Sequence, residues 1–222
     1  MLIYGRAFSF FLSLLIPFFL TRILVKEDYG SYQQLIMIYT IVQAILIFGM
    51  PQSLLYYFPR KETHEHPLLI KQTWTILLFS SLMVMAIFWL SSQIIGTHHL
   101  KEYLVLLGIY TSLMIFVMPI QNLLTLEGKI STAMWLMVFF TIIDLAVLPT
   151  AAWLNPTTLG IIHGIIIAAA LKAIMVLFHV YSTYFTREIS GNSYIKEQLA
   201  YGIPVGLTAM VYVINVNVCL LY

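Results

Sequence analysis

The sequence predicts an all-α protein, a polytopic transmembrane helix bundle. Hydrophobic residues make up 61% of the 222 residues and charged residues 9%, whereas a soluble globular domain has about 25% charged residues. The apolar residues form long runs without the alternation of period two that a membrane barrel strand needs. Because lipid cannot hydrogen-bond to a free backbone, we expect each run to be helical.

The first membrane helix is expected at 2–24, a run that lacks the basic start and the small-residue cleavage site of a secretory signal. Lys26, Glu27 and Asp28 then predict a solvated turn, with Gly30 relaxing the backbone before the second helix. Prolines 17, 51, 119, 149 and 204 lie within or near helix ends and permit bends. The other helices are expected at 35–57, 73–95, 102–124, 133–154, 160–182 and 201–222.

The distribution of basic residues predicts a multi-pass protein with a cytoplasmic N-terminus. In that orientation Lys172 lies mid-helix, and the longest charged segments, 59–71 and 183–198, are cytoplasmic. The basic residues expected outside are Arg22, Lys26 and Lys101. Those expected inside are Arg6, Arg60, Lys61, Lys71, Lys129, Arg187 and Lys196.

Several classes of function are disfavoured by composition. A net charge of +2 without a basic stripe gives no case for nucleic acid binding, and one cysteine, Cys219, rules out an internal disulfide framework. Glu62, His64 and His66 share a charged loop, but a metal needs a rigid and complete ligand set, so we interpret this segment as a solvated loop. We expect neither a bound metal nor a cofactor.

The segment Pro17–Leu35, with the sequence PFFLTRILVKEDYGSYQQL, joins a helix end to an arginine and an acidic turn. It resembles the end of the first helix and the first outer loop of the polysaccharide-transport flippases, a branch of the multidrug/oligosaccharidyl-lipid/polysaccharide superfamily that serves O-antigen, capsule and exopolysaccharide synthesis. Phe48–Arg60 resembles the exit of that family's second helix, and Leu199–Pro204 resembles the entry to its seventh. The positions that carry the first resemblance are Pro17, Thr21, Arg22, Leu24, Glu27, Asp28, Tyr29, Gly30 and Tyr32.

The resemblance implies a protein with two lobes of six helices each. Leu199-Ala-Tyr-Gly202 repeats three of the four residues of Leu2-Ile-Tyr-Gly5, as parallel repeats separated by six helices would. We therefore expect residues 1–182 to form an N-terminal six-helix lobe and 183–200 a cytoplasmic linker. Residues 201–222 would be the first helix of a truncated second lobe, in a longer or interrupted reading frame.

Two ionisable residues are expected inside the bilayer, where an unpaired charge costs at least about 2.5 kcal/mol. Asp144 and Lys172 lie about 16 and 15 Å above the same face on adjacent antiparallel helices, which predicts an ion pair. It could be a structural clasp, or Lys172 could face a cavity and attract an anionic head group while Asp144 holds it or relays protons. His179, seven residues after Lys172, would extend this stripe, although a membrane histidine is more often part of hydrogen-bonded packing.

Arginines at the helix ends are further candidates. Arg6 enters the first helix and Arg60 ends the second on the cytoplasmic side, while Arg22 lies at the outer interface. Snorkelling to lipid is the ordinary role of such residues. The resemblance implies instead that basic residues, with Arg6, Arg22, Arg60 and Lys172 as candidates, bind the diphosphate of a lipid-linked sugar.

The resemblance implies a transporter that flips polyprenyl-diphosphate-linked oligosaccharide across the cytoplasmic (inner) membrane for surface polysaccharide such as the O-antigen of lipopolysaccharide. Its partners would be this lipid-linked oligosaccharide, membrane lipids and a coupling ion, H⁺ or Na⁺. The alternatives are an exporter of drugs or organic cations and an inactive truncated remnant. An enzyme is not expected, because His163 and His179 are about 24 Å apart along one helix and no nucleophile motif is present.

Overall fold

The computed structural model describes residues 2–94, 98–185 and 193–219. Every regular element in these ranges is helical, including a short 3₁₀ turn at Phe58–Arg60 and a π-helical turn at Tyr181–Phe185. The α-helices are α1 (Leu2–Ile23), α2 (Lys26–Leu46), α3 (Met50–Tyr57), α4 (His66–Ile94), α5 (His98–Val117), α6 (Ile120–Leu126), α7 (Ile130–Leu154), α8 (Thr158–Val180) and α9 (Ile195–Cys219).

The helices form a polytopic membrane bundle, which confirms the predicted fold class. Among the described residues, five segments are long and apolar enough to span a bilayer, and the bent pair α2–α3 makes a sixth. The five lie at Gly5–Ile23, His66–Ile94, Glu102–Leu126, Ile130–Leu154 and Thr158–Phe185. Over its described part α9, the predicted seventh helix, does not meet the same criterion of length and composition.

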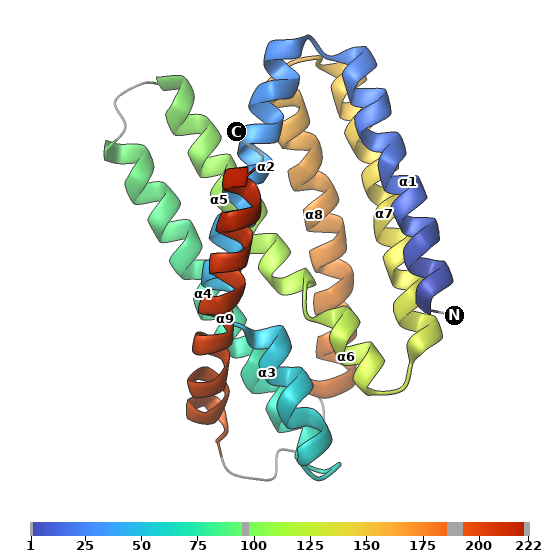
Figure 1. Cartoon of the computed structure of the whole chain (residues 1–222), viewed down its shortest axis with the longest axis vertical. Coiled ribbons are helices and arrows are strands. Elements are labelled where there is room, and N and C mark those ends of the chain that lie inside the picture. Colours follow the sequence, from blue (N-terminus) through green and yellow to red (C-terminus); the bar gives the residue numbers. More distant parts are fainter. Residues whose placement is uncertain (1, 95–97, 186–192, 220–222) are drawn as a thin grey trace.

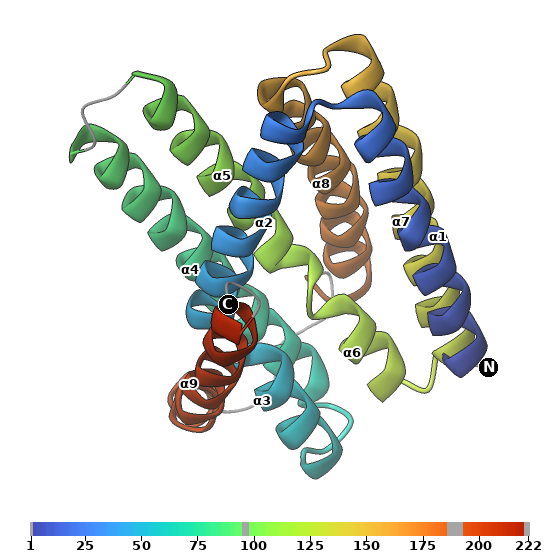
Figure 2. The same cartoon turned by 45° about the horizontal axis from the view of Figure 1, so that its top comes forward.

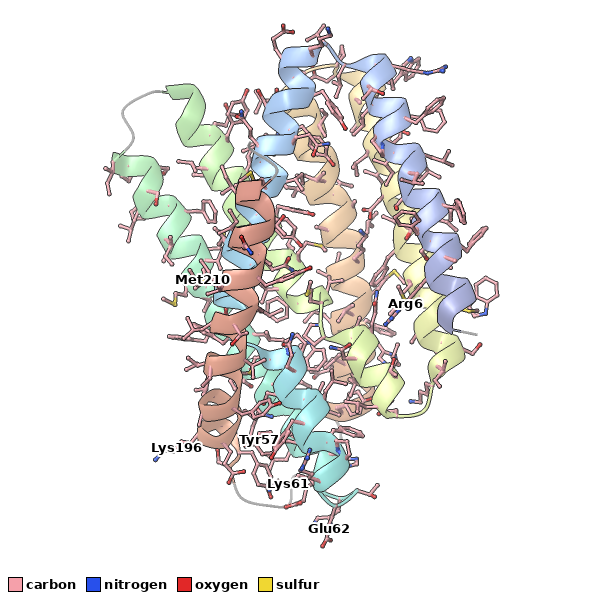
Figure 3. All side chains as sticks on the ribbon, in the orientation of Figure 1. Arg6, Tyr57, Lys61, Glu62, Lys196 and Met210 are labelled. Carbon is pink, nitrogen blue, oxygen red and sulfur yellow. The ribbon has the colours of Figure 1, made fainter. Side chains whose placement is uncertain are left out.

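Figure 1 shows the helices packed side by side as a row, with α1 against α7, α7 against α8, α8 against α5 and α5 against α4. The α1–α2 and α7–α8 turns lie at the upper end, and the α3–α4 and α6–α7 connections at the lower end. The turned view in Figure 2 shows α9 lying across α2 and α3 on one side of the row. Figure 3 shows Lys61, Glu62 and Lys196 gathered at the lower end. The two ends thus carry the alternating connections that a spanning bundle needs.

The prediction of one continuous helix at 35–57 is wrong at its start. Helix α2 begins at Lys26, directly after a connection made by Leu24 and Val25, so Lys26, Glu27 and Asp28 form its first turn and Gly30 lies within it. Carboxylates in a first turn are stabilised by the partial positive charge at a helix N-terminus. The acidic residues therefore begin a helix here, where the sequence had suggested a loop.

The same predicted helix is also broken, and so is the one predicted at 102–124. Phe48 and Gly49 have φ of 50° and 60°, in the left-handed region that ends a helix. Pro51 lies in the first turn of α3, which leaves α2 at a bend of 43°. The second break falls before Pro119, between α5 and α6. The first break changes the direction of the lower half of its span, and the second interrupts the helix within the span Glu102–Leu126.

Helix α9 packs against the break between α2 and α3, and glycines of α9 make the contact. A Cβ atom added at Gly202 would lie 2.4 Å from the carbonyl oxygen of Phe48, and one at Gly206 would lie 2.9 Å from the amide nitrogen of Gly49. Small residues four positions apart allow two helix backbones to approach this closely. The glycines therefore place α9 directly against the α2–α3 break.

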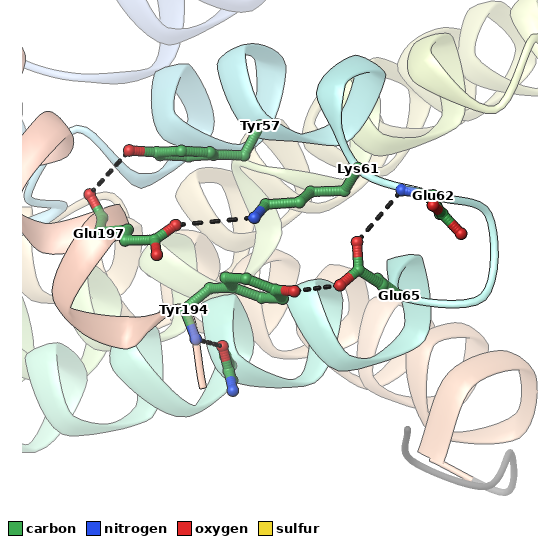
Figure 4. A network of polar contacts seen from close by, with 7 residues as sticks. Tyr57, Lys61, Glu62, Glu65, Tyr194 and Glu197 are labelled. Atoms are coloured by element: carbon green, nitrogen blue, oxygen red, sulfur yellow. Dashed lines mark hydrogen bonds and ion pairs between the residues drawn. The ribbon is translucent and has the colours of Figure 1, made fainter. Parts of the chain in front are cut away.

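A polar network holds the start of α9 to the lower end of α4 (Figure 4). The hydroxyl of Tyr194 donates to the carboxylate of Glu65, and its backbone N–H donates to Gln72 Oε1 at 2.8 Å. Lys61 Nζ lies 3.8 Å from the carboxylate of Glu197 and 3.8 Å from the ring centroid of Tyr194. These contacts fix α9 at the end opposite the α1–α2 turn.

At the other end, Asp28 joins α2 to the start of α8. Its Oδ1 accepts a hydrogen bond from the backbone N–H of Thr158 at 2.9 Å and one from the Thr158 hydroxyl at 2.5 Å. The first N–H groups of a helix have no partner within the helix, so a carboxylate placed there stabilises it. The acidic turn that the sequence singles out therefore fastens two membrane helices together.

Replacing Asp28 with alanine should lower the free energy of unfolding by roughly 1–2 kcal/mol, because the N-terminus of α8 loses its acceptor. Unfolding of the purified protein in mixed detergent micelles measures this change. Glu27→Ala is the matched control, since it removes the same charge from the same turn at an exposed position and should change stability by less than about 0.5 kcal/mol. Equal losses in the two variants would contradict the role of Asp28.

The contact between Glu65 and Tyr194 should make the docking of α9 depend on pH. The hydrogen bond from Tyr194 lowers the pKa of Glu65 below its usual 4.5, and the same bond raises the pKa of Tyr194 to about 12. A lowered carboxyl pKa contributes stability above pH 4.5 that is lost as the pH falls through the lowered value. Hydrogen exchange over residues 195–200, corrected for the intrinsic effect of pH, should therefore speed up in acid.

The variant Tyr194→Phe removes the donor and should abolish this acid-dependent gain in exchange. Tyr181→Phe is the control, because Tyr181 is exposed and stacks only on Phe185 among the ring contacts of the described residues. The same acid response in Tyr194→Phe and in the unmodified protein would show that another group controls the docking of α9.

Candidate functional site

A cavity of about 590 Å³ lies among the broken helices and α7, α8 and α9, and we call it the central cavity. Both helix breaks contribute to its wall, through Gly49 and Pro51 at the first and Met118 at the second. Its polar lining residues are Thr40, Gln43, Gln52, Gln121, Asn122, Thr141, Asp144 and Lys172. The bends in α2–α3 and α5–α6 therefore create an internal space lined by hydrogen-bonding groups.

Asp144 on α7 and Lys172 on α8 form an ion pair in this cavity, as their matched depths predict. Lys172 Nζ lies 2.5 Å from Asp144 Oδ1. The Lys172 side chain is 7% exposed and that of Asp144 is 30% exposed. Both side chains line the cavity, and that of Asp144 is the more accessible of the two.

Gln43, one helix turn before the first break, is a cavity residue that the sequence analysis missed. It is 4% exposed, and its Nε2 has no hydrogen-bond partner within 3.5 Å among the described residues. The rings of Tyr39 and Tyr110 pack beside it with centroids 4.6 Å apart, and the Tyr39 hydroxyl interacts with both Gln43 and Tyr110. The signal available in the sequence was an amide within the largely apolar half of the helix, three residues after Thr40.

The three candidate arginines do not line the central cavity. Arg22 is exposed at the end of α1, with its guanidinium 4.2 Å from the ring centroid of Phe18. Arg60 is exposed below α3, 3.7 Å from the ring centroid of Tyr56. Arg6 is exposed on the first turns of α1, and in Figure 3 its side chain lies on the side of α1 that faces α8. The charged residues that line the cavity within the described part of the chain are therefore Asp144 and Lys172.

His179 is on the same helix as Lys172 but lines a different cavity. That cavity has a volume of about 260 Å³ and is mostly apolar, with Ile120 and Leu124 of α6 in its wall. The Nε2 atom of His179 is buried there without a hydrogen-bond partner among the described residues. The structure therefore does not bring His179 together with the ion pair, which lines the central cavity.

The central cavity is suited to binding an uncharged, hydrogen-bonding group. Carboxamides and hydroxyls offer both donors and acceptors, and the two opposite charges of Asp144 and Lys172 neutralise each other. Across residues 2–94, 98–185 and 193–219, no three His, Cys, Asp or Glu side chains converge as a metal site would require. The polar groups that do converge are amides, hydroxyls and one ion pair.

Comparison with known protein families identifies the chain. A family model described as polysaccharide biosynthesis protein matches residues 19–221. The chain belongs to this family. No curated protein and no solved structure matches it. The family agrees with the resemblance carried by Pro17–Leu35.

In this member of the polysaccharide biosynthesis protein family, the segments that carry the resemblance hold the bundle together around the cavity. Pro17–Leu35 contains Asp28, which joins α2 to α8. Phe48–Arg60 begins at the helix break against which Leu199–Pro204 packs through Gly202. The three segments that resemble the family therefore lie at helix junctions. Most of the polar residues that line the cavity lie outside these segments.

The ion pair should show strong energetic coupling in a double-mutant cycle. Asp144→Asn and Lys172→Met each leave an uncompensated group in the protein interior, whereas the double variant removes both charges. We expect a coupling energy of roughly 1–3 kcal/mol, measured by unfolding in mixed detergent micelles. Asp144→Asn combined with His179→Ala is the control, because the two residues line separate cavities, and the two effects should add. Additivity in both cycles would contradict a stabilising ion pair.

Proposed function

We propose that this protein flips a polyprenyl-diphosphate-linked oligosaccharide from the inner to the outer leaflet of the cytoplasmic membrane, as a step in the synthesis of a surface polysaccharide such as O-antigen. Membership of a polysaccharide biosynthesis family supports the substrate class. The observation that carries the proposal is the central cavity, a polar space of about 590 Å³ among apolar membrane helices. Such a space offers a glycan the hydrogen bonds that lipid cannot provide.

The two helix breaks support a moving transporter. Polar backbone groups at a break are tolerated inside a membrane where they are buried in protein or line a cavity, and Gly49 and Pro51 do both. In our proposal residues 1–182 form one lobe of a two-lobed transporter with its N-terminus in the cytoplasm, and α9 begins the second. Bending at these breaks as the two lobes rock would expose the cavity to each leaflet in turn.

The diphosphate requires groups outside the described lining of the cavity. We assign Arg6 and Arg60 to the cytoplasmic mouth, since an arginine fork matches phosphate oxygens, and Arg22 to the outer end. The prenyl chain remains in lipid between the helices. A coupling ion, H⁺ or Na⁺, would act at Asp144, whose carboxylate is the accessible member of the ion pair. This chemistry is binding and movement, so we propose a transporter and not an enzyme.

A complementation assay tests this function in a bacterium that lacks its own oligosaccharide flippase. The full-length gene should restore surface polysaccharide, and Asp144→Ala or Lys172→Ala should reduce it at least about tenfold, since each variant leaves an uncompensated charge in the cavity. Lys26→Ala is the control, because Lys26 is an exposed basic residue at the upper end, and it should retain normal polymer.

Two results would contradict the proposal. One is a correctly inserted protein that restores no surface polymer. The other is export of an organic cation such as ethidium that depends on Asp144, since a cation exporter would use the same carboxylate. Immunoblots of membrane fractions establish insertion for every variant, so that loss of polymer is not confused with loss of protein.

A further inference from the structure

We infer that the central cavity contains a subsite for an uncharged sugar, in which Asp144 accepts and Gln43 donates hydrogen bonds to glycan hydroxyls while Lys172 positions Asp144. This inference rests on the proposed function and adds a substrate preference to it. In this inference Gln43 binds the ligand. Asp144 contacts the ligand and Lys172 holds Asp144, whereas one interpretation of the sequence was that Lys172 attracts an anion and Asp144 holds Lys172. Three features of the structure carry it.

The first feature is the orientation of the ion pair. The side chain of Lys172 is 7% exposed and makes a 2.5 Å contact with Asp144, whose side chain is 30% exposed. A ligand in the cavity can therefore reach more of the Asp144 side chain than of the Lys172 side chain. An ionised carboxylate only accepts hydrogen bonds, so the ligand group that fits is a donor such as a sugar hydroxyl.

The second feature is a buried donor that α2 contributes to the same cavity. Gln43 is 4% exposed, lines the cavity and has no hydrogen-bond partner for Nε2 within 3.5 Å among the described residues. An amide nitrogen carries two N–H groups, so a longer interaction with the Tyr39 hydroxyl still leaves one for a ligand. Leaving such a donor unpaired is unfavourable. Glycan hydroxyls, which both accept and donate, could pair with Gln43 and with Asp144.

The third feature is the absence of net charge along the described lining. Asp144 and Lys172 cancel, and the other polar lining residues are amides and hydroxyls. An acidic sugar would be placed against the carboxylate of Asp144, and like charges brought together in this way oppose binding. The volume of about 590 Å³ is within the range of pockets that enclose a small-molecule ligand. The cavity thus favours a short, uncharged part of the glycan.

Transport of two matched lipids by the full-length protein in proteoliposomes tests the preference. Both are polyprenyl-diphosphate trisaccharides, one with three uncharged N-acetylhexosamines and one with a hexuronic acid in place of the last. We expect the uncharged lipid to be flipped at least about tenfold faster, and Asp144→Asn to reduce this ratio about tenfold, the effect of roughly 1.4 kcal/mol. Gln43→Leu should slow the uncharged lipid by a similar factor. Gln34→Leu is the matched control, because Gln34 is an exposed glutamine on the same helix, and it should behave as the unmodified protein.

Binding of a soluble probe separates failure of the subsite from failure of the transport function. Saturation-transfer NMR with the uncharged N-acetylglucosamine trisaccharide should give a signal with the unmodified protein in nanodiscs that Gln43→Leu reduces at least about fivefold, as loss of a hydrogen bond of about 1 kcal/mol would. Equal flipping of both lipids, or a ratio unchanged by Asp144→Asn, would overturn the subsite while leaving transport intact. If neither lipid is flipped, the proposed function fails, and the binding result decides the subsite: a signal that depends on Gln43 supports it, and no signal overturns it.

Discussion

Hydrocarbon cannot hydrogen-bond to a polypeptide, and most of this structure follows from that constraint. Each long apolar run becomes a helix because only then do its backbone groups pair with one another. Polar side chains are then stable where the protein itself provides partners. They occur at the helix junctions, as with Asp28 and Thr158, at the lower end around Tyr194, and around the central cavity.

The cavity exists because two of the membrane spans are not straight. Glycine in the left-handed region at position 49 and proline at 119 interrupt helices that would otherwise pack side by side along their full length. The lower half of the first span leaves the upper half at 43°, and the space beside the two breaks is lined by side chains from both spans. The buried charges of Asp144 and Lys172 are on the unbroken helices α7 and α8, so the straight helices supply the ion pair and the bent ones supply the space.

The sequence predicted those features that depend on composition and length. The ends of α1, α7 and α8 fall within a few residues of the predicted bounds, and helical rise alone placed Asp144 beside Lys172. Both breaks lie beside prolines, 51 and 119, that were expected to permit bends, but the end of α2 at Phe48 and Gly49 was not predicted, because a positive φ leaves no trace in a hydropathy pattern. The start of α2 was missed because charged residues that stabilise a first turn look the same, in sequence, as a loop. Gln43 was missed because one amide does not interrupt an apolar run, and its significance comes from neighbours distant in the chain.

The contact between α9 and the α2–α3 break also limits how this protein can change during evolution. Gly49, Gly202 and Gly206 touch backbone to backbone, and a single methyl group at any of them would lie within 3 Å of main-chain atoms that cannot rotate away. A larger residue at Gly202 or Gly206 can be accommodated only if the helices separate, which would remove the reason for glycine at the other of the two, whereas Gly49 also has a φ of 60°. Among related proteins positions 202 and 206 should therefore vary together, and an exchange at one of them would mark a lineage in which the two helices meet differently.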